Sequence, residues 1–399
     1  MDRPLTIGID ASFLTRDSRG MGRCIRAILD RWHPRRTDAR ASKPPEAEAD
    51  QHKHRFILLS FAKRHLKTLA SWAKEGWQVD WSGSEHDLDV CWFPWNRIDW
   101  EPSCPKLAFI HDVAPFTSHD AGNRHREQDQ IRMADAAAEA DRVMTNSNFS
   151  RSEIHRHLGL DLDTIDVVHL AYDANTFFPS DVPSVALPES VEAGNYMLFV
   201  GNVEHRKNLH GLLEAYSLIR RDARLPLVLV CPRPTSHWSS RLRGQYNQLE
   251  VMASKLSDHL IWLDAVDDPT LVELYRRTRL FIMPSLYEGF GLPLLEAMAC
   301  GAPVAAAHAS SLPEVGGNVP AWFNPLDPVD IARTLVDLLD HEMADPEPGF
   351  EQARKFNWQA TADQTLTLLE TTLKRAPRTG SGRFSAVRAA LAALESPAP

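Results

Sequence analysis

Apolar residues follow two alternating patterns along the first part of the chain. Short continuous runs predict strands, and stretches with an apolar residue every three or four positions predict helices between them. The predicted strands span 5–11, 56–61, 90–93, 107–110 and 142–145, and the predicted helices span 24–32, 62–74 and 124–140. Strands that alternate with helices favour a parallel sheet covered on both faces.

The same alternation starts again near residue 196. The second set of predicted strands spans 196–201, 225–231, 259–263, 280–283 and 304–307, and the predicted helices span 209–216, 271–277 and 293–300. Between the two sets, segment 171–194 is rich in proline, which is typical of a linker. The pattern therefore predicts an α/β protein with two doubly wound domains, one over 1–170 and one over 195–355.

Charge and composition disfavour several classes of protein. The chain has 44 Lys and Arg against 53 Asp and Glu, a net charge of −9, which disfavours a general nucleic-acid binder. No apolar run reaches the roughly 18 residues of a membrane span, and the first residues lack the pattern of a signal peptide. The five cysteines are scattered, without a CxxC pair. We therefore expect a cytoplasmic protein.

Ligands of open parallel sheets bind beyond the carboxyl ends of the strands, so polar clusters there are candidate sites. Gly20-Met21-Gly22-Arg23 precedes a predicted helix, and its glycines could bring backbone N–H groups close to an anion. A tight turn explains these glycines equally well. His111 and Asp112 follow the predicted strand 107–110, so His111 is expected to point toward a ligand. The alternative is a structural histidine held by Asp112.

A third cluster, Arg206-Lys207-Asn208, stands between a predicted strand and a predicted helix. Asn208 is a favourable N-cap residue. Two cations just before a helix N-terminus oppose the helix dipole, which already carries partial positive charge there. A bound pyrophosphate would compensate for this placement. The alternative is a solvated basic turn.

The fourth cluster covers residues 284–296. Gly289 and Gly291 bracket Phe290, and the helix that follows offers N–H groups toward phosphate. Glu288 could hydrogen-bond a sugar, and Glu296, one turn into the helix, could accept hydrogen bonds from ribose hydroxyls. Paired carboxylates can also serve as a glycosidase acid and base. Here they would flank an anion site, which favours a role in orienting a ligand.

Taken together, these residues resemble the retaining glycosyltransferases of family four, which have the GT-B fold. The similarity is strongest from Tyr196 to Asp330, and Glu288 and Glu296 reproduce the family's spacing of two glutamates with seven residues between them. In the first half, the Gly20–Arg23 cluster and His111-Asp112 look like their counterparts. The Glu-x-Arg-Lys-Asn form of 204–208 is similar to a mannosyltransferase-like subgroup that often uses GDP-mannose.

The resemblance implies two Rossmann-like domains that face a cleft, with the acceptor on the first and a nucleotide-sugar donor on the second. It also implies a crossover helix over 356–373. The Gly, Ser, Pro and Arg residues after Lys374 predict, from composition, a flexible tail over 374–399. Many relatives have Arg where this chain has Asn202, so neutralisation of the donor diphosphate would rest on the next two cations. The implied site residues are Arg206 and Lys207 for the diphosphate, Glu296 for the ribose, Glu288 with the amides of Gly289, Phe290, Gly291 and Leu292 for the sugar and phosphate, Gly22 for phosphate, and His111 for the transferred sugar or the acceptor.

The expected function is therefore transfer of a hexose, with mannose favoured, to a glycan or glycolipid in surface polysaccharide synthesis. The family retains the anomeric configuration, and this scheme needs neither a metal nor a cofactor. A nucleotide-sugar epimerase and an inactive sugar-nucleotide-binding subunit remain as alternatives. The spacing of the two glutamates disfavours the first, and the intact charged set disfavours the second.

Three further features are weaker. Asp87-Leu88-Asp89 and Asp161-Leu162-Asp163 have the form of a metal-binding triplet, but we expect no metal there. Trp95 and Trp100 are candidates for stacking on the acceptor, because aromatic faces bind sugars. Lys63, Arg64, His65 and Lys67 lie on a predicted amphipathic helix that could contact an anionic membrane, although an ordinary surface helix is the simpler interpretation.

Overall fold

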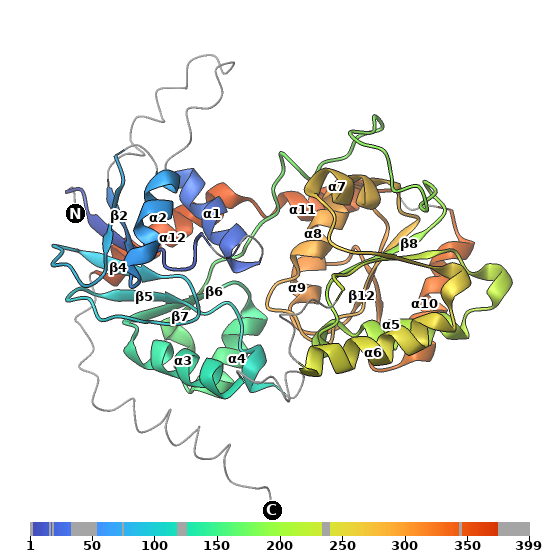
Figure 1. Ribbon diagram of the computed structural model, residues 1–399, viewed down its shortest axis with the longest axis horizontal. Coiled ribbons are helices and arrows are strands. Elements are labelled where there is room, and N and C mark those ends of the chain that lie inside the picture. The colour runs from blue at the N-terminus through green and yellow to red at the C-terminus, as the bar shows by residue number, and fades with distance from the viewer. Residues whose placement is uncertain are drawn as a thin grey trace, which may run out of the picture. The chain divides into compact units, whose positions relative to one another are not determined.

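The computed structural model describes residues 3–15, 17, 20–32, 54–73, 76–117, 126–233, 240–342 and 345–373. The chain forms two compact units, and Figure 1 labels their elements. Unit 1 comprises Met1–Val113, Gln128–Leu170 and Trp358–Pro399, and unit 2 comprises Ala114–Glu127 and Ala171–Asn357. The predicted tail over 374–399 lies outside the described residues.

The sheet of unit 1 is entirely parallel, with strands in the order β3-β2-β1-β4-β5-β6-β7. Its order reverses between β1 and β4, which makes the carboxyl ends of these two strands a topological switch point. The strands are β1 (Thr6–Asp10), β2 (Arg55–Ser60), β3 (Gln78–Trp81), β4 (Val90–Phe93), β5 (Lys106–Phe109), β6 (Arg142–Thr145) and β7 (Ile165–Val167).

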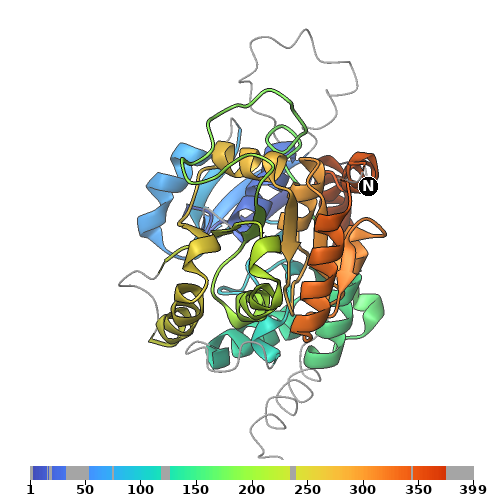
Figure 2. The ribbon, with the colours of Figure 1, turned by 90° about the vertical axis from the view of Figure 1, so that its right-hand side faces the viewer.

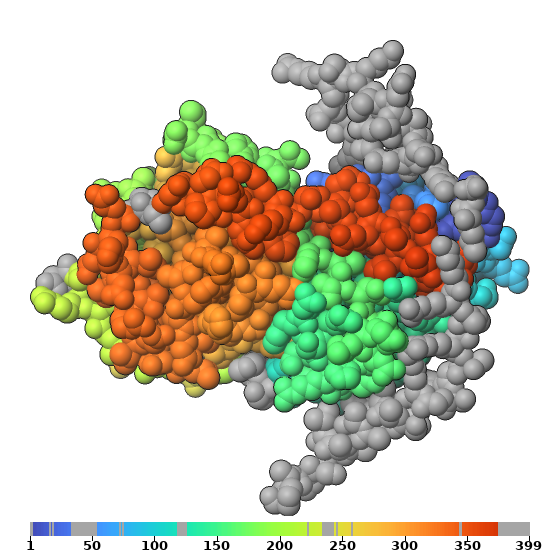
Figure 3. All heavy atoms as spheres, turned by 180° about the vertical axis from the view of Figure 1, so that it is seen from behind, coloured from blue at the N-terminus to red at the C-terminus, as the bar shows by residue number. Residues whose placement is uncertain are grey.

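Helices cover both faces of this sheet. On one face lie α1 (Met21–Trp32), α2 (Leu66–Trp72) and α12 (Trp358–Thr372), and on the other lie α3 (Arg126–Glu139) and α4 (Asn148–Leu158). The last described helix therefore returns to the unit in which the chain began, and Figure 3 shows it in red on the surface of unit 1. The Trp32 indole N–H at the end of α1 donates to the Ala362 carbonyl in α12 at 3.0 Å.

Unit 2 repeats the architecture with a parallel sheet in the order β10-β9-β8-β11-β12-β13. Its switch point lies between β8 and β11. The strands are β8 (Met197–Val200), β9 (Leu227–Val230), β10 (Leu260–Leu263), β11 (Leu280–Met283), β12 (Val304–Ala307) and β13 (Ala321–Phe323). The central strands β8, β9, β11 and β12 are almost completely buried, as their apolar runs predict.

The helices of unit 2 also form two layers (Figures 1 and 2). On one face lie α7 (Asp268–Arg277), α8 (Leu292–Ala299) and α11 (Glu347–Arg354), and on the other lie α5 (Leu209–Leu218), α6 (Ser240–Ser254) and α10 (Pro328–Asp340). The short helix α9 (Leu312–Gly316) follows β12. Segment 171–194 forms neither helix nor strand and is held to α7, where the Glu273 carboxylate accepts from the Ser184 backbone N–H and hydroxyl at 3.0 Å.

Candidate functional site

The loops that follow β8 and β11 lie side by side, because these strands are neighbours at the switch point of unit 2. The first loop runs from Gly201 to Asn208 and the second from Pro284 to Gly291. Their backbones are joined directly, since the Leu286 N–H donates to the Arg206 carbonyl at 2.8 Å. The fold thus brings together two clusters that are 82 residues apart in the sequence, because Arg206 in the first donates a hydrogen bond to Glu288 in the second.

Asn208 fixes the first loop. Its backbone is left-handed, with φ of 54°, and its side-chain amide donates to the carbonyls of Pro284 at 3.1 Å and Pro325 at 2.8 Å. Asn208 occupies the N-cap position of α5, as predicted, but it makes no side-chain capping bond. The expected capping role is therefore wrong: the side chain ties three loops together instead of capping the helix.

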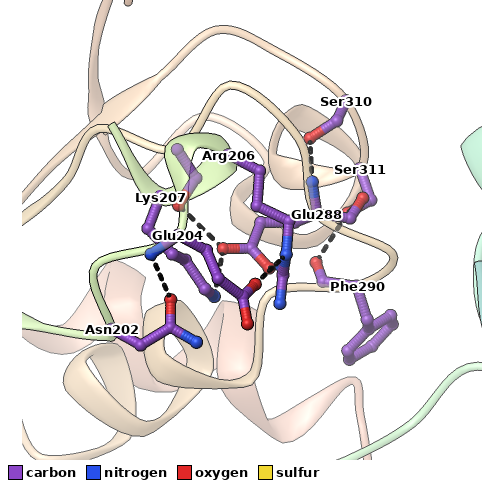
Figure 4. Close-up of polar contacts among 9 residues, drawn as sticks. Asn202, Glu204, Arg206, Lys207, Glu288, Phe290, Ser310 and Ser311 are labelled. Carbon is purple, nitrogen blue, oxygen red and sulfur yellow. Dashed lines mark hydrogen bonds and ion pairs between the residues drawn. The ribbon is translucent and has the colours of Figure 1, made fainter. Parts of the chain in front are cut away.

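Arg206, Lys207 and Glu288 converge in one charged cluster (Figure 4). Lys207 Nζ donates to Glu288 Oε1 at 2.6 Å, and Arg206 Nη1 donates to Glu288 Oε2 at 3.3 Å. The Ser285 hydroxyl also donates to Glu288 Oε1, at 2.7 Å. On its outer side, Arg206 Nε donates to Glu204 Oε2 at 2.6 Å. Two cations are thus paired with two carboxylates.

Burial and charge act in opposite directions on Glu288. The side chain is only 7% exposed, and burial alone raises the pKa of its carboxyl group. The attraction of Lys207 and Arg206, with hydrogen bonds from Lys207 and Ser285, outweighs burial and holds that pKa below its ordinary value. Glu288 is therefore ionised at neutral pH.

The turn between Glu288 and α8 has a fixed backbone. Ser310 Oγ accepts from the Glu288 N–H at 3.0 Å, and the Ser311 hydroxyl donates to the carbonyls of Glu288 at 3.0 Å and Phe290 at 2.8 Å. Gly291 has φ of 108°, which favours glycine, and a Cβ there would lie 2.7 Å from Leu312 Cδ2, so any other residue would strain the backbone and displace Leu312. Helix α8 begins at the next residue, Leu292, and presents its N-terminus to this turn.

Two further predicted donor residues, Phe290 and Glu296, also have buried side chains in unit 2. The Phe290 ring packs edge-on against Phe356, with ring centroids 5.7 Å apart, which leaves the backbone of Phe290 to face the turn. Glu296 lies in α8, and the Tyr275 hydroxyl donates to Glu296 Oε2 at 3.4 Å. Its role as a ribose ligand stays a prediction.

His111 lies in unit 1, just beyond the end of β5. The Pro94 carbonyl accepts a hydrogen bond from His111 Nε2 at 3.0 Å, and the ring stacks on Phe109 with centroids 3.7 Å apart. The His111 N–H donates to Asn96 Oδ1 at 2.7 Å. Burial, only partly opposed by the Pro94 hydrogen bond, lowers the pKa of His111 to about 4. The ring is therefore neutral at physiological pH.

The other predicted residues of unit 1 have structural partners. Gly22 lies in the first turn of α1, and its N–H donates to Asp17 Oδ2 at 3.1 Å. Trp95 is buried, and its indole N–H donates to the Asp10 carbonyl at 2.7 Å. Trp100 packs on Phe93, with ring centroids 5.0 Å apart. The donor role of Gly22 and the acceptor role of both tryptophans stay predictions.

The first Asp-x-Asp triplet and the basic helix, which are weaker features of the sequence, lie outside the charged cluster of unit 2. Asp89, in the first Asp-x-Asp triplet, accepts from the Thr6 N–H at 2.8 Å and pairs with Arg3. Within the described residues, no group of three His, Cys, Asp or Glu side chains could hold a metal ion. The predicted helix 62–74 is a 3₁₀ turn, Lys63–His65, followed by α2. No helix in the described ranges is both long and apolar enough to cross a membrane.

The chain has two Rossmann-like units, and the second places the charged cluster of two cations and two carboxylates at its switch point. This fold and this site define a glycosyltransferase of the GT-B class. The family described as glycosyl transferases group 1 matches residues 188–361, which include every site residue of unit 2 named above. O-antigen chain mannosyltransferase B of Escherichia coli is 33% identical over 271 residues, or 64% of this chain and 68% of that protein. The chain belongs to this family of glycosyltransferases and is similar to its mannosyltransferases.

Other similarities agree with this assignment. Serotype-specific mannosyltransferase WbdA of Escherichia coli is 35% identical over 199 residues, which are 49% of this chain but only 24% of that protein. The crystal structure of Anabaena HepE in complex with UDP and glucose superposes with a TM-score of 0.66 at 15% identity, covering 92% of this chain and 100% of that one. At this identity the structural similarity supports the fold, which confirms the predicted GT-B class.

Sequence reasoning missed several contributors to the site. Glu204, Ser285, Ser310 and Ser311 all hold charged or backbone groups of the cluster. Ser285 and Ser311 lie inside the segments that carried the family resemblance, so their position was a usable signal. Glu204 is the first residue of the Glu-x-Arg-Lys-Asn form noted in the sequence, but that form alone gave no indication that its carboxylate pairs with Arg206.

Proposed function

We propose that this protein is a retaining glycosyltransferase that moves a hexose, with mannose favoured, from a nucleotide-diphosphate sugar to a glycan or glycolipid in surface polysaccharide synthesis. The observation that carries the proposal is the convergence of Arg206 and Lys207 beside Glu288 at the switch point of unit 2. The Escherichia coli relatives named as mannosyltransferases, one of them an O-antigen chain enzyme, support the sugar and the pathway.

In this proposal, the donor is held by groups of both charge signs. Arg206 and Lys207 contact the diphosphate, while Glu288 and the backbone amides of the turn that leads into α8 hold the sugar and phosphate. Glu296 binds the ribose. The Glu-x-Arg-Lys-Asn form of residues 204–208 favours GDP-mannose over UDP-sugars.

The proposed reaction exchanges one bond at the anomeric carbon for another on the same face. The bond to the phosphate oxygen breaks, the acceptor oxygen bonds to the carbon, and the acceptor proton passes to the departing diphosphate. Arg206, Lys207 and the N-terminus of α8 stabilise the negative charge that develops on the leaving group. His111, which is neutral, contributes a hydrogen bond to a sugar hydroxyl, not a positive charge.

The test is incubation of the purified chain with GDP-mannose, UDP-glucose and UDP-N-acetylglucosamine, with mannose-containing oligosaccharides as acceptors. We expect release of nucleoside diphosphate from one donor and a product with the donor's anomeric configuration by NMR, at an unchanged rate in EDTA. Inversion at the anomeric carbon would contradict retention, and loss of rate in EDTA would contradict metal independence.

The same assay separates the two alternatives. An epimerase would convert the donor into its isomer without an acceptor. An inactive subunit would bind nucleotide, seen as a raised melting temperature, without releasing diphosphate from any donor.

We also propose that the protein works in the cytoplasm and that Lys63, Arg64, His65 and Lys67 allow contact with the anionic inner face of a membrane. Among these, Lys63, Arg64 and Lys67 are exposed. At low salt, the protein should float with liposomes that contain anionic lipid. If no protein floats with them, this part of the proposal is contradicted.

A further inference from the structure

Glu204 is a carboxylate of the charged cluster to which the proposed chemistry gives no task. Its one hydrogen-bonding and ion-pairing partner through the side chain, among the residues that the structure describes, is Arg206, at 2.6 Å. The Glu204 backbone is fixed separately, because its N–H donates to Asn202 Oδ1 at 3.1 Å and its carbonyl accepts from the Lys207 N–H at 2.9 Å. The side chain can therefore move without disturbing the loop.

Exposure distinguishes the two carboxylates of the cluster. The Glu288 side chain is 7% exposed and bonded to Lys207, Arg206 and Ser285, so releasing it would break three contacts. The Glu204 side chain is 39% exposed and would break one. An exposed ion pair of this kind contributes little, about 0–1 kcal/mol, so its rupture is easy. Of the two carboxylates, Glu204 is therefore the easier one to displace from Arg206.

The charges of the cluster put Glu204 and an incoming diphosphate in competition for Arg206. Arg206 and Lys207 supply two positive charges, and Glu204 and Glu288 supply two negative ones, so the cluster without ligand has no net charge. A diphosphate that binds Arg206 brings at least two more negative charges close to Glu204. The guanidinium has five N–H donors, but its Nε is already committed to Glu204.

We propose that Glu204 is a built-in competing anion that occupies Arg206 in the empty site, lowers the affinity for the nucleoside diphosphate and speeds its release after transfer. This inference rests on the proposed function, because it takes the diphosphate of a nucleotide-sugar as the ligand of Arg206 and Lys207. When the diphosphate arrives, the Glu204 side chain swings toward solvent. When the diphosphate leaves, Glu204 pairs with Arg206 again.

The test is calorimetric titration of the full chain and its Glu204→Gln variant with GDP and with UDP. Glutamine keeps the length of the side chain and an oxygen that can accept from Arg206, but removes the charge. A unit charge about 6 Å from a dianion in aqueous surroundings corresponds to about a tenfold change in affinity, and salt reduces it. We therefore expect the variant to bind the preferred diphosphate about three- to tenfold more tightly and to release it more slowly.

Three controls define the effect. Glu214→Gln makes the same charge change at an exposed position of α5 and should leave the affinity unchanged. Glu204→Asp keeps the charge and should stay close to the parent. Raising the salt concentration to about 0.5 M should shrink the difference between parent and Glu204→Gln, because the effect is electrostatic. Circular dichroism and thermal melting check that each variant folds.

Equal or weaker binding by Glu204→Gln, with a parent that binds normally, would overturn the inference and would assign Glu204 to holding Arg206 in its binding position. A parent chain that binds neither GDP nor UDP would instead overturn the proposed function. The two failures are therefore distinguishable in one set of titrations.

Discussion

Each unit has a buried carboxylate at the switch point of its sheet, and the two carboxylates have opposite electrostatics. In unit 1, Asp10 ends β1, and burial raises its pKa to about 6, although the Ser12 hydroxyl donates to its Oδ1 at 2.5 Å. Within the described part of the chain, Asp10 Oδ2 has no hydrogen-bond partner. In unit 2, Glu288 follows β11, and two cations hold its pKa below the ordinary value.

The comparison teaches that the sheet topology fixes where a site can form, whereas the loops determine which charged residues lie there. Both units have a parallel sheet whose strand order reverses at a central strand. In unit 2, the loop after β8 brings two cations into contact with the buried carboxylate. Among the residues that the structure describes, Asp10 has no such ion pair. The two cations suit this place in unit 2 to an anion.

The largest expected effect comes from removing a cation of unit 2. Lys207→Ala should lower the rate of sugar transfer by on the order of 10²-fold or more, because a charge-assisted contact to the leaving group is lost. Initial rates of diphosphate release measure it. Lys255→Ala, at an exposed lysine of the same unit, should keep the parent rate. Transfer by Lys207→Ala at the parent rate would remove Lys207 from the mechanism.

The second prediction concerns stability at the two carboxylates. Asp10 has a folded-state pKa above its unfolded value, so the parent loses stability as pH rises from about 4 through about 6. Asp10→Asn removes this loss and should be more stable than the parent above pH 6, by on the order of 3 kcal/mol, with a smaller difference at pH 4. Urea unfolding at several pH values measures it, and a difference independent of pH would contradict the raised pKa.

Glu288→Gln should behave in the opposite direction. The folded-state pKa of Glu288 is depressed, so its stabilising contribution is present above the ordinary pKa of a glutamate and disappears as pH falls through the folded value. The variant should therefore be less stable than the parent at pH 7, and the gap should narrow under acid conditions. The same urea series provides the measurement.

A third prediction tests the turn before α8. Gly291→Ala should lower the free energy of unfolding by about 1–3 kcal/mol, because alanine disfavours φ of 108° and its Cβ would press on Leu312. Gly244→Ala, in α6 with open space around the added methyl, is the matched control and should be neutral or slightly stabilising. Equal stability of Gly291→Ala and the parent would show that the turn can relax.

The smallest expected effect is at His111. Because its folded-state pKa is about 4, the ring should stay neutral from pH 8 down to about pH 5, with the proton on Nε2 facing the Pro94 carbonyl. Nitrogen-15 NMR of the histidine rings, with His111→Gln to assign the signal, measures both tautomer and titration. A ring that becomes charged near pH 6.5 would contradict this arrangement.

Much of this architecture could be predicted from the sequence, because buried parallel strands are continuous apolar runs. The predicted strands over 90–93 and 280–283 coincide with β4 and β11. The pattern missed β3, whose residues Gln78–Trp81 alternate in polarity at a half-exposed sheet edge. It also missed β7 and β13, each of which is only three residues long.

The site was predictable where chemistry lies in a motif and not where it depends on contacts between loops. Arg206, Lys207 and Glu288 came from residue type and position after a strand. The amide of Asn208, however, reaches the carbonyls of Pro284 and Pro325, which are distant in sequence. The low pKa of His111 likewise depends on burial, which a local pattern around residue 111 does not reveal.

The return of α12 to unit 1 has a consequence for the order in which the protein is built. Trp32 in α1 donates to Ala362, and Arg142 at the start of β6 donates to Thr371 at 3.3 Å, so α12 completes contacts made by residues from far earlier in the chain. During synthesis, unit 2 has its last residue once Asn357 has left the ribosome. Unit 1 begins first but is completed second, because α1 can make its contacts with α12 only after α12 has been synthesised.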